Sequence, residues 1–227
     1  MTNVEGMTKQ TRSSFVIRHS SFRAGGAFTL IELLIVMAII LVLAGLILAT
    51  SDYVQKKGYR SRAEVEIAAI SAALENYKAD HGVYPRGKSI AAPPNGSPTY
   101  AVAATGTDDL NARTDLTSSG SKYRDASRYL YEQLSGDLNL DLSPDTGSKS
   151  YMPFKESNLA LIKDATGKTV GLSHIKDPFG NSYGYSSGGA TTPPVGYNPT
   201  FDLWSTCGNK DPNETDQQYV ARWIKNW

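Results

Sequence analysis

The stretch that decides the fold is residues 28–49, which read FTLIELLIVMAIILVLAGLILA. Apart from Thr29, Glu32 and Gly45 it is wholly apolar. As a helix that rises 1.5 Å per residue, this length spans roughly 33 Å, which is enough to cross a bilayer core of about 30 Å. The sequence therefore predicts one membrane-spanning helix over residues 28–50.

A basic segment precedes the apolar stretch. In residues 1–27 a single acid, Glu5, stands against four basic residues: Lys9, Arg12, Arg18 and Arg23. Positive segments resist translocation, so this end should stay in the cytoplasm. The small residues 24–27, AGGA, come before the apolar stretch, whereas a secretory signal carries them after it. This order predicts a leader that is removed on the cytoplasmic side, which leaves the helix on the mature protein. An uncut signal anchor is the alternative.

Glu32 is the only ionisable residue of the apolar stretch. A charge inside a membrane helix is costly, and such residues are by default candidates for a functional site. If the chain is cut before Phe28, a new α-amino group appears four residues upstream of Glu32. In a staggered bundle, the amine of one subunit could meet Glu32 of its neighbour, which would offset the desolvation cost and fix the register. This chemistry favours cleavage and polymerisation over a passive anchor.

The segment from Ala27 to Leu34, AFTLIELL, resembles the prepilin peptidase site shared by type IV pilins and type II secretion pseudopilins. The resemblance implies cleavage between Ala27 and Phe28, N-methylation of Phe28, and an assembly role for Glu32. It also implies two partners, prepilin peptidase and further copies of the chain in a filament. The family usually has Gly immediately before the cut, where this sequence has Ala27.

Composition leaves room for one modest domain besides the helix. The chain has 227 residues, 40% of them hydrophobic and 20% charged, with a net charge of +1. So small a charge gives no argument for nucleic acid as a partner. Cys207 is the single cysteine, so an intramolecular disulfide is excluded.

Residues 52–80 continue the helical pattern beyond the membrane. Apolar residues recur there at steps of three and four: Ala63, Ile67, Ile70, Leu74 and Tyr77. The helix should end near Asp80-His81-Gly82, because Gly terminates helices and Pro85 cannot continue one. We therefore expect residues 51–82 to form a periplasmic spine helix and residues 83–227 a globular head. The turn Gly82-Val-Tyr-Pro85 resembles the turn that follows the family's spine helix.

The sequence of the head predicts an α+β fold with an antiparallel sheet. Residues 86–122, rich in Pro, Gly, Ser and Thr, indicate an irregular surface loop, and a helix is expected at about 122–135 with Gly136 as its stop. Short runs with strand character follow: Leu159–Ile162, Thr169–Ile175, Ser182–Ser186 and Phe201–Thr206. Residues 177–181, DPFGN, predict a turn.

Three later segments sharpen the resemblance. Asp177–Tyr183, Phe201–Ser205 and Lys225–Trp227 resemble, in this order, segments of the major pseudopilin of type II secretion. This implies a single-pass inner-membrane protein with a periplasmic head. It would polymerise into a periplasmic pseudopilus that drives protein export, with minor pseudopilins and the inner-membrane secretion platform as partners. A type IV pilin or minor pilin for adhesion, motility or DNA uptake is the alternative.

The polar segment Ser205–Asp216 is a candidate calcium site. It offers five oxygen-bearing side chains: Asn209, Asp211, Asn213, Glu214 and Asp216. Calcium takes six to eight oxygen ligands, which loops of alternating Asp and Asn can supply. The resemblance implies calcium in the corresponding loop, with Asn209, Asp211 and Asp216 as ligands. A solvated turn is the alternative.

Catalytic motifs give no argument for an enzyme. Residues 184–188, GYSSG, fit the nucleophile-elbow pattern G-x-S-x-G, but no His follows His174, and Gly189 with Pro193 opposes the helix that an elbow requires. The three His residues are isolated from one another and from Cys207, so zinc has no support. We therefore predict a structural subunit.

Overall fold

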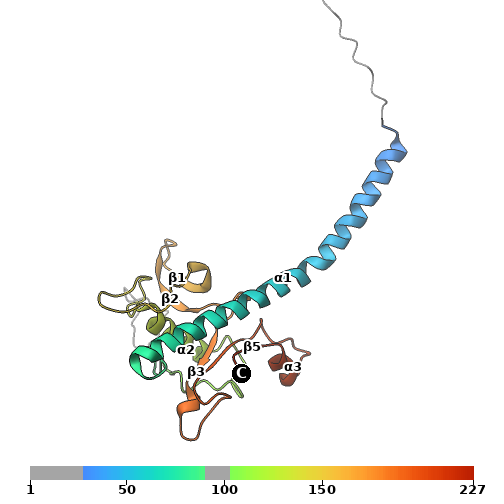
Figure 1. Cartoon of the computed structure of the whole chain (residues 1–227). Coiled ribbons are helices and arrows are strands. Elements are labelled where there is room, and N and C mark those ends of the chain that lie inside the picture. The colour runs from blue at the N-terminus through green and yellow to red at the C-terminus, as the bar shows by residue number, and fades with distance from the viewer. Residues whose placement is uncertain (1–27, 90–102) are drawn as a thin grey trace, which may run out of the picture. The chain divides into compact units, whose positions relative to one another are not determined.

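The computed structural model describes residues 28–89 and 103–227. The chain divides into two compact units, Met1–Thr50 and Ser51–Trp227, and helix α1 (Leu30–His81) contributes residues to both. Figure 1 shows this helix and the elements of the second unit. The expected leader, residues 1–27, lies outside the described residues.

In the first unit, the described residues form the start of α1. The large apolar side chains from Leu30 to Leu48 are each at least 50% exposed, and Phe28 is 82% exposed. Within the described residues, α1 is the one helix long and apolar enough to cross a membrane. The predicted long apolar helix is therefore present, and it begins two residues after Phe28.

In the second unit, α1 buries the apolar stripe that the sequence predicts. All five predicted members are buried: Ala63, Ile67, Ile70, Leu74 and Tyr77. Ala73, which the pattern did not include, is buried as well. The helix ends at His81, where Gly82 takes a positive φ of 77° and donates its N–H to the carbonyl of Lys78 at 2.7 Å. Only Gly adopts this conformation without steric cost, so the predicted end of the helix is confirmed.

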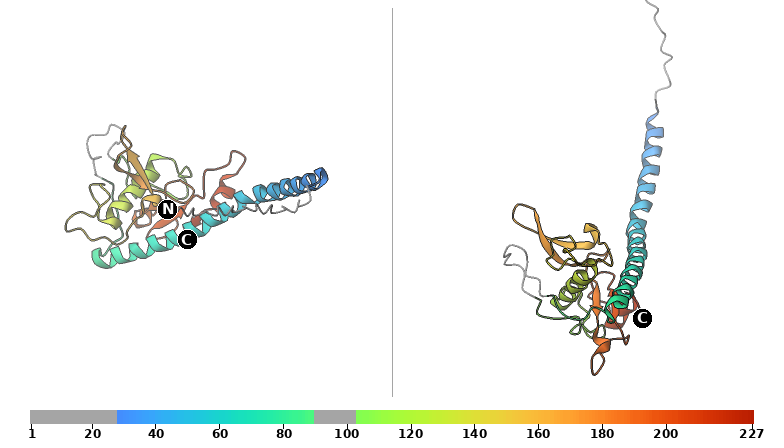
Figure 2. Two further views of the ribbon diagram at one scale, coloured as in Figure 1. Left: turned by 90° about the horizontal axis from the view of Figure 1, so that it is seen from above. Right: turned by 60° about the vertical axis from the view of Figure 1, so that its left-hand side comes forward.

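Helix α2 (Ser121–Ser135) confirms the second predicted helix. Gly136 ends it in the left-handed conformation, and its N–H donates to the carbonyl of Glu132 at 3.1 Å. Leu130 and Leu134 of α2 share one core cluster with the stripe of α1. The views in Figure 2 agree that α2 lies beside the second half of α1.

The described strands form two antiparallel sheets. The two-stranded sheet pairs β1 (Leu159–Lys163) with β2 (Thr169–Ile175) and follows the 3-10 turn η2 (Glu156–Asn158). The three-stranded sheet has the order β3-β4-β5, formed by β3 (Gly184–Ser186), β4 (Asp202–Ser205) and β5 (Ile224–Lys225). A second 3-10 turn, η3 (Gly188–Ala190), follows β3. The α+β fold class is confirmed.

Two elements near the C-terminus are absent from the sequence prediction. These are α3 (Asp216–Ala221) and β5. The four predicted strands match β1 to β4 with shifts of two residues or fewer at their ends. The missed strand has only two residues, which is too short to show an alternating pattern.

The prediction that residues 86–122 form a surface loop is wrong in one respect. The described parts of this loop, residues 86–89 and 103–120, are irregular as expected, but Leu110 and Ala112 are fully buried. Both belong to a second core cluster, which also contains Tyr123 of α2 and Trp204 of β4. The segment covers these rings, and the apolar area that it removes from water stabilises the fold.

Gly184 is required by the packing of this second cluster. It lies opposite Trp204 in the β3–β4 ladder. A Cβ atom at position 184 would overlap the indole ring of Trp204. The indole Nε1 in turn donates to the hydroxyl of Tyr123 at 3.1 Å, which ties the sheet to α2.

Candidate functional site

The start of α1 is a capping box. Thr29, which precedes the first helical residue, donates its backbone N–H and its hydroxyl to Oε2 of Glu32 at 2.9 and 2.8 Å. The N–H of Glu32 donates back to Oγ1 of Thr29 at 3.3 Å. Reciprocal bonds of this kind satisfy backbone donors that a helix start otherwise leaves without partners. Glu32 therefore has a structural role inside its own chain.

This role leaves the carboxylate able to accept a further bond. The hydrogen bonds that the Glu32 carboxylate accepts from described residues both use Oε2, and Thr29 supplies both donors. The capping box also holds the carboxylate near the helix start, four residues from Phe28. The pattern Thr29-x-x-Glu32 directly before an apolar run is a sequence signature of such a helix start.

The apolar surface that follows Glu32 has no cover from the described part of the chain. Side chains from Leu33 to Leu48 are exposed around the whole helix. Gly45 has no neighbouring atom within 4 Å of the place where a Cβ would lie, among the described residues outside its own stretch of helix. A helix that is apolar on all sides is typical of burial in a membrane or among other helices. The cleavage bond between Ala27 and Phe28 stays a prediction, because Ala27 lies outside the described residues.

The loop between β4 and α3 contains the residues that were expected to bind calcium. Oδ1 of Asp211 accepts the N–H of Asn213 at 2.8 Å, within its own turn. Oδ1 of Asp216 lies 2.6 Å from Nζ of Lys210. Asn209 contributes its backbone carbonyl to a contact with Arg222 at 2.5 Å.

The expected calcium ligands each contact other groups of the protein in this arrangement. In the described part of the chain, no group of three or more His, Cys, Asp or Glu side chains is placed to hold a metal ion. Asp211 and Asp216 contact different N–H or ammonium donors and do not converge on one point. Calcium binding by this loop stays a prediction.

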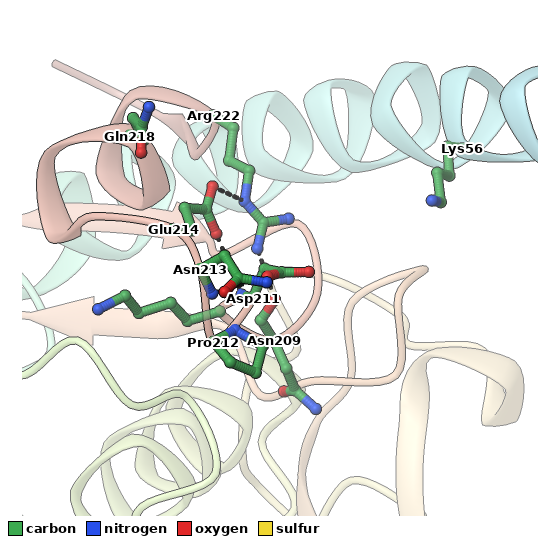
Figure 3. Close-up of a pocket in the computed structure, with 9 residues that line it drawn as sticks. Lys56, Asn209, Asp211, Pro212, Asn213, Glu214, Gln218 and Arg222 are labelled. Atoms are coloured by element: carbon green, nitrogen blue, oxygen red, sulfur yellow. Dashed lines mark hydrogen bonds and ion pairs between the residues drawn. The ribbon is translucent and has the colours of Figure 1, made fainter.

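Sequence reasoning missed Arg222, which holds this loop together (Figure 3). Its Nη1 donates to the carbonyl of Cys207 at 2.8 Å, and its Nε lies 2.9 Å from Oε1 of Glu214 in an ion pair. Figure 3 shows the guanidinium directed into the loop. No local pattern marks a single Arg as a partner of backbone carbonyls up to 15 residues away.

Helix α3 begins with a second capping box. Thr215 accepts the N–H of Gln218 at 3.3 Å, and the side chain of Gln218 accepts the N–H of Thr215 at 3.0 Å. The pattern Thr-x-x-Gln is a sequence signature for a helix start. It could have predicted α3, although a six-residue helix shows little apolar periodicity.

The single thiol and the candidate nucleophile are both buried. Burial raises the pKa of the Cys207 thiol, and the nearby charge of Arg60 opposes the rise only in part. Ser186 is 1% exposed and lies in β3, which continues into the three-residue turn η3. This is not the strand-to-helix geometry of a nucleophile elbow.

Comparison with known proteins adds one match. Residues 23–48 match the family described as the prokaryotic N-terminal methylation motif. No curated protein and no solved structure matches the chain. The match supports a subunit of the pilin or pseudopilin type, which implies processing by prepilin peptidase and assembly into filaments. Pilin-like proteins with this motif are structural subunits, not enzymes.

Proposed function

We propose that this chain is a structural subunit of a periplasmic pseudopilus, which polymerises through α1 to drive protein export by type II secretion. The observation that carries the proposal is the exposed apolar surface of Leu33–Leu48 directly after the capped Glu32. Lipid covers this surface while the subunit is stored in the inner membrane. Sister helices cover it in the filament.

The role of Glu32 in assembly follows from the same geometry. Cleavage before Phe28 creates an ammonium group at the helix start, and the capping box holds the carboxylate of Glu32 at that end of the helix. The ammonium of one subunit pairs with Glu32 of the next and sets the axial register. Within a bundle this pair offsets the cost of removing both charges from water.

The head gives support for a pseudopilin in particular. The three segments that resemble the major pseudopilin contact one another in the structure. Asp177 accepts the hydroxyl hydrogen of Ser205 at 2.6 Å, and Trp204 pairs with Lys225 in the β4–β5 ladder. The ring of Trp227 lies 5.8 Å from that of Trp204. The resemblance therefore rests on residues that form one structural unit rather than on scattered matches.

Mass spectrometry of the protein from cells with a working prepilin peptidase tests the first step. We expect a mature chain that begins at an N-methylated Phe28. A mature chain that retains residues 1–27 would refute the proposal. As a second step, Glu32→Ala should insert in the membrane normally but assemble poorly, and a normal filament yield would refute the pairing.

Deletion of the gene distinguishes the two kinds of filament. A pseudopilin is required for secretion, so enzymes that the wild type releases into the medium should accumulate in the periplasm of the deletion strain. Loss of adhesion, motility or DNA uptake with normal secretion would instead identify a type IV pilin or minor pilin. Complementation with the intact gene is the control.

A further inference from the structure

Arg222 places its guanidinium where the loop between β4 and α3 turns around it (Figure 3). Nη1 and Nη2 donate to the carbonyls of Cys207 and Asn209 at 2.8 and 2.5 Å. Nε lies 2.9 Å from a carboxylate oxygen of Glu214, whose side chain is only 15% exposed. The guanidinium also lies over the ring of Tyr219, 4.8 Å from its centroid.

This set of contacts is the kind that a bound divalent cation makes. Two backbone carbonyls and one carboxylate surround a single positive charge, and calcium sites in loops use these same oxygen types. A guanidinium supplies up to five N–H donors in a fixed planar arrangement and keeps its charge at all physiological pH values. In this loop, Arg222 therefore contacts the carbonyl and carboxylate oxygens that would otherwise be available to a metal ion.

The other carboxylates of the loop have partners of their own. Asp216 contacts the ammonium of Lys210, and Asp211 accepts the N–H of Asn213. A calcium ion that took Glu214 or Asp216 as a ligand would compete with Arg222 or Lys210 for that carboxylate. An ion bound to Glu214 would lie close to the guanidinium of Arg222, and like charges at short distance repel.

The backbone of Arg222 is fixed as well as its side chain. Nη1 of Arg60, on α1, donates to the carbonyl of Arg222 at 2.7 Å and lies 3.5 Å from Sγ of Cys207. Cys207 has a positive φ of 55°, a conformation that costs energy for a residue other than Gly. Its carbonyl accepts the bond from Arg222, so the clamp holds the strained entrance of the loop.

We propose that Arg222 is a built-in cation that closes the loop of residues 207–214, so that this part of the head is ordered without a bound calcium ion. This inference goes beyond the proposed function, because it holds for a pseudopilus subunit and for a pilus subunit alike. It also separates this chain from the metal-dependent arrangement that the sequence resemblance implies.

Thermal unfolding of the full chain in detergent micelles tests the proposal. Tryptophan fluorescence reports on the head, because Trp204, Trp223 and Trp227 are the only tryptophans of the chain. We expect the wild type to melt at the same temperature in excess calcium chloride and in excess EGTA. Arg222→Gln should lower the melting temperature by about 4–8 °C, since it removes charge-assisted bonds from a half-buried site.

Arg124→Gln is the matched control, because Arg124 is an exposed arginine of α2 and the substitution removes the same charge. It should shift the melting temperature by less than about 2 °C. A wild type that calcium stabilises and EGTA destabilises would overturn the proposal. An Arg222→Gln variant with the same melting temperature as the Arg124→Gln variant would also overturn it. If Arg222→Gln does not fold, the calcium and EGTA comparison on the wild type still decides.

Discussion

Asp177 is a buried carboxyl group that should make the head less stable at neutral pH than at mildly acidic pH. Its side chain accepts bonds from the hydroxyl of Ser205 at 2.6 Å and from the N–H groups of Phe179 and Asn181 at 3.0 and 2.8 Å. The residue is only 2% exposed. Burial raises the pKa of Asp177 to about 6, although these hydrogen bonds favour the charged form.

The size of the effect follows from this pKa. A rise from 3.8 to about 6 corresponds to about 3 kcal/mol of proton-linked stability. Because the folded state binds the proton more tightly than the unfolded chain, this stabilisation is fully present below pH 3.8 and is lost as the pH rises through about 6. For a chain of this size, 3 kcal/mol corresponds to roughly 6–12 °C in melting temperature.

The substitution that isolates this effect is Asp177→Asn, which keeps an acceptor oxygen for the two backbone N–H groups but cannot ionise. Burial also raises the pKa of Glu132 to about 7, so Glu132 titrates in the same range in both proteins. The quantity to compare is the difference between the melting temperatures of the variant and the wild type. Glu132 contributes equally to both, so its contribution cancels in this difference. This difference should increase by roughly 5–10 °C between about pH 4 and about pH 7, because part of the stabilisation is already lost at pH 4.

The constant cost of the amide itself does not affect this test, because it enters the difference equally at both pH values. Fluorescence-detected melting of the full chain in detergent, at several pH values across this window, gives the required curves. A difference that stays constant with pH would show that Asp177 has no raised pKa, and would refute the reasoning from burial.

Three further predictions concern the helix start, the sheet and α3. Glu32→Gln keeps an acceptor for Thr29 but removes the charge, so it should insert in the membrane yet yield far less sedimentable filament than the wild type. A wild-type yield would show that capping alone explains this residue. Gly184→Ala drives a methyl group into the Trp204 ring and should cost about 1–3 kcal/mol, seen as a lower melting temperature; unchanged melting would contradict the packing. Thr215→Ala removes the cap of α3 and should cost about 1 kcal/mol in the same assay, whereas Thr215→Ser should restore it.

Much of the fold could be predicted because its signals are local. A step of three and four in apolar residues set the buried face of α1, and Gly82 and Gly136 ended α1 and α2 where positive φ was needed. Four short strands were found between turn residues. In each case the residues that carry the signal lie within about one or two turns of the element that they define.

The burial of Leu110 and Ala112 could not be predicted in the same way. The segment that contains them is polar on average and has no periodic pattern. Its apolar residues are buried because they pack in one cluster with Tyr123 and with Trp204, which is about 90 residues away in sequence. Tertiary packing therefore decided a feature that composition assigned to the surface.

Of the two candidate sites, the one at the start of α1 could be predicted from the sequence, and the arrangement of the loop between β4 and α3 could not. The apolar stretch and Glu32 stand in a short motif, and the match to residues 23–48 covers that motif. The C-terminal loop drew attention through its Asp and Asn residues, yet its geometry depends on Arg222 and on Arg60 of α1. Contacts to backbone carbonyls leave no trace in residue types, so this part required the structure.

The contact between Arg60 and Arg222 joins residues that lie 162 positions apart. Contacts of such long range form slowly, because the intervening chain must first be brought into place. One core cluster likewise combines Ala63 of α1 with Ile224 of β5. Under the proposed export topology, the order of events is therefore fixed. The membrane segment can insert early, but the head can finish folding only after β5 has been translocated, and the stripe of α1 stays a target for chaperones and proteases until then.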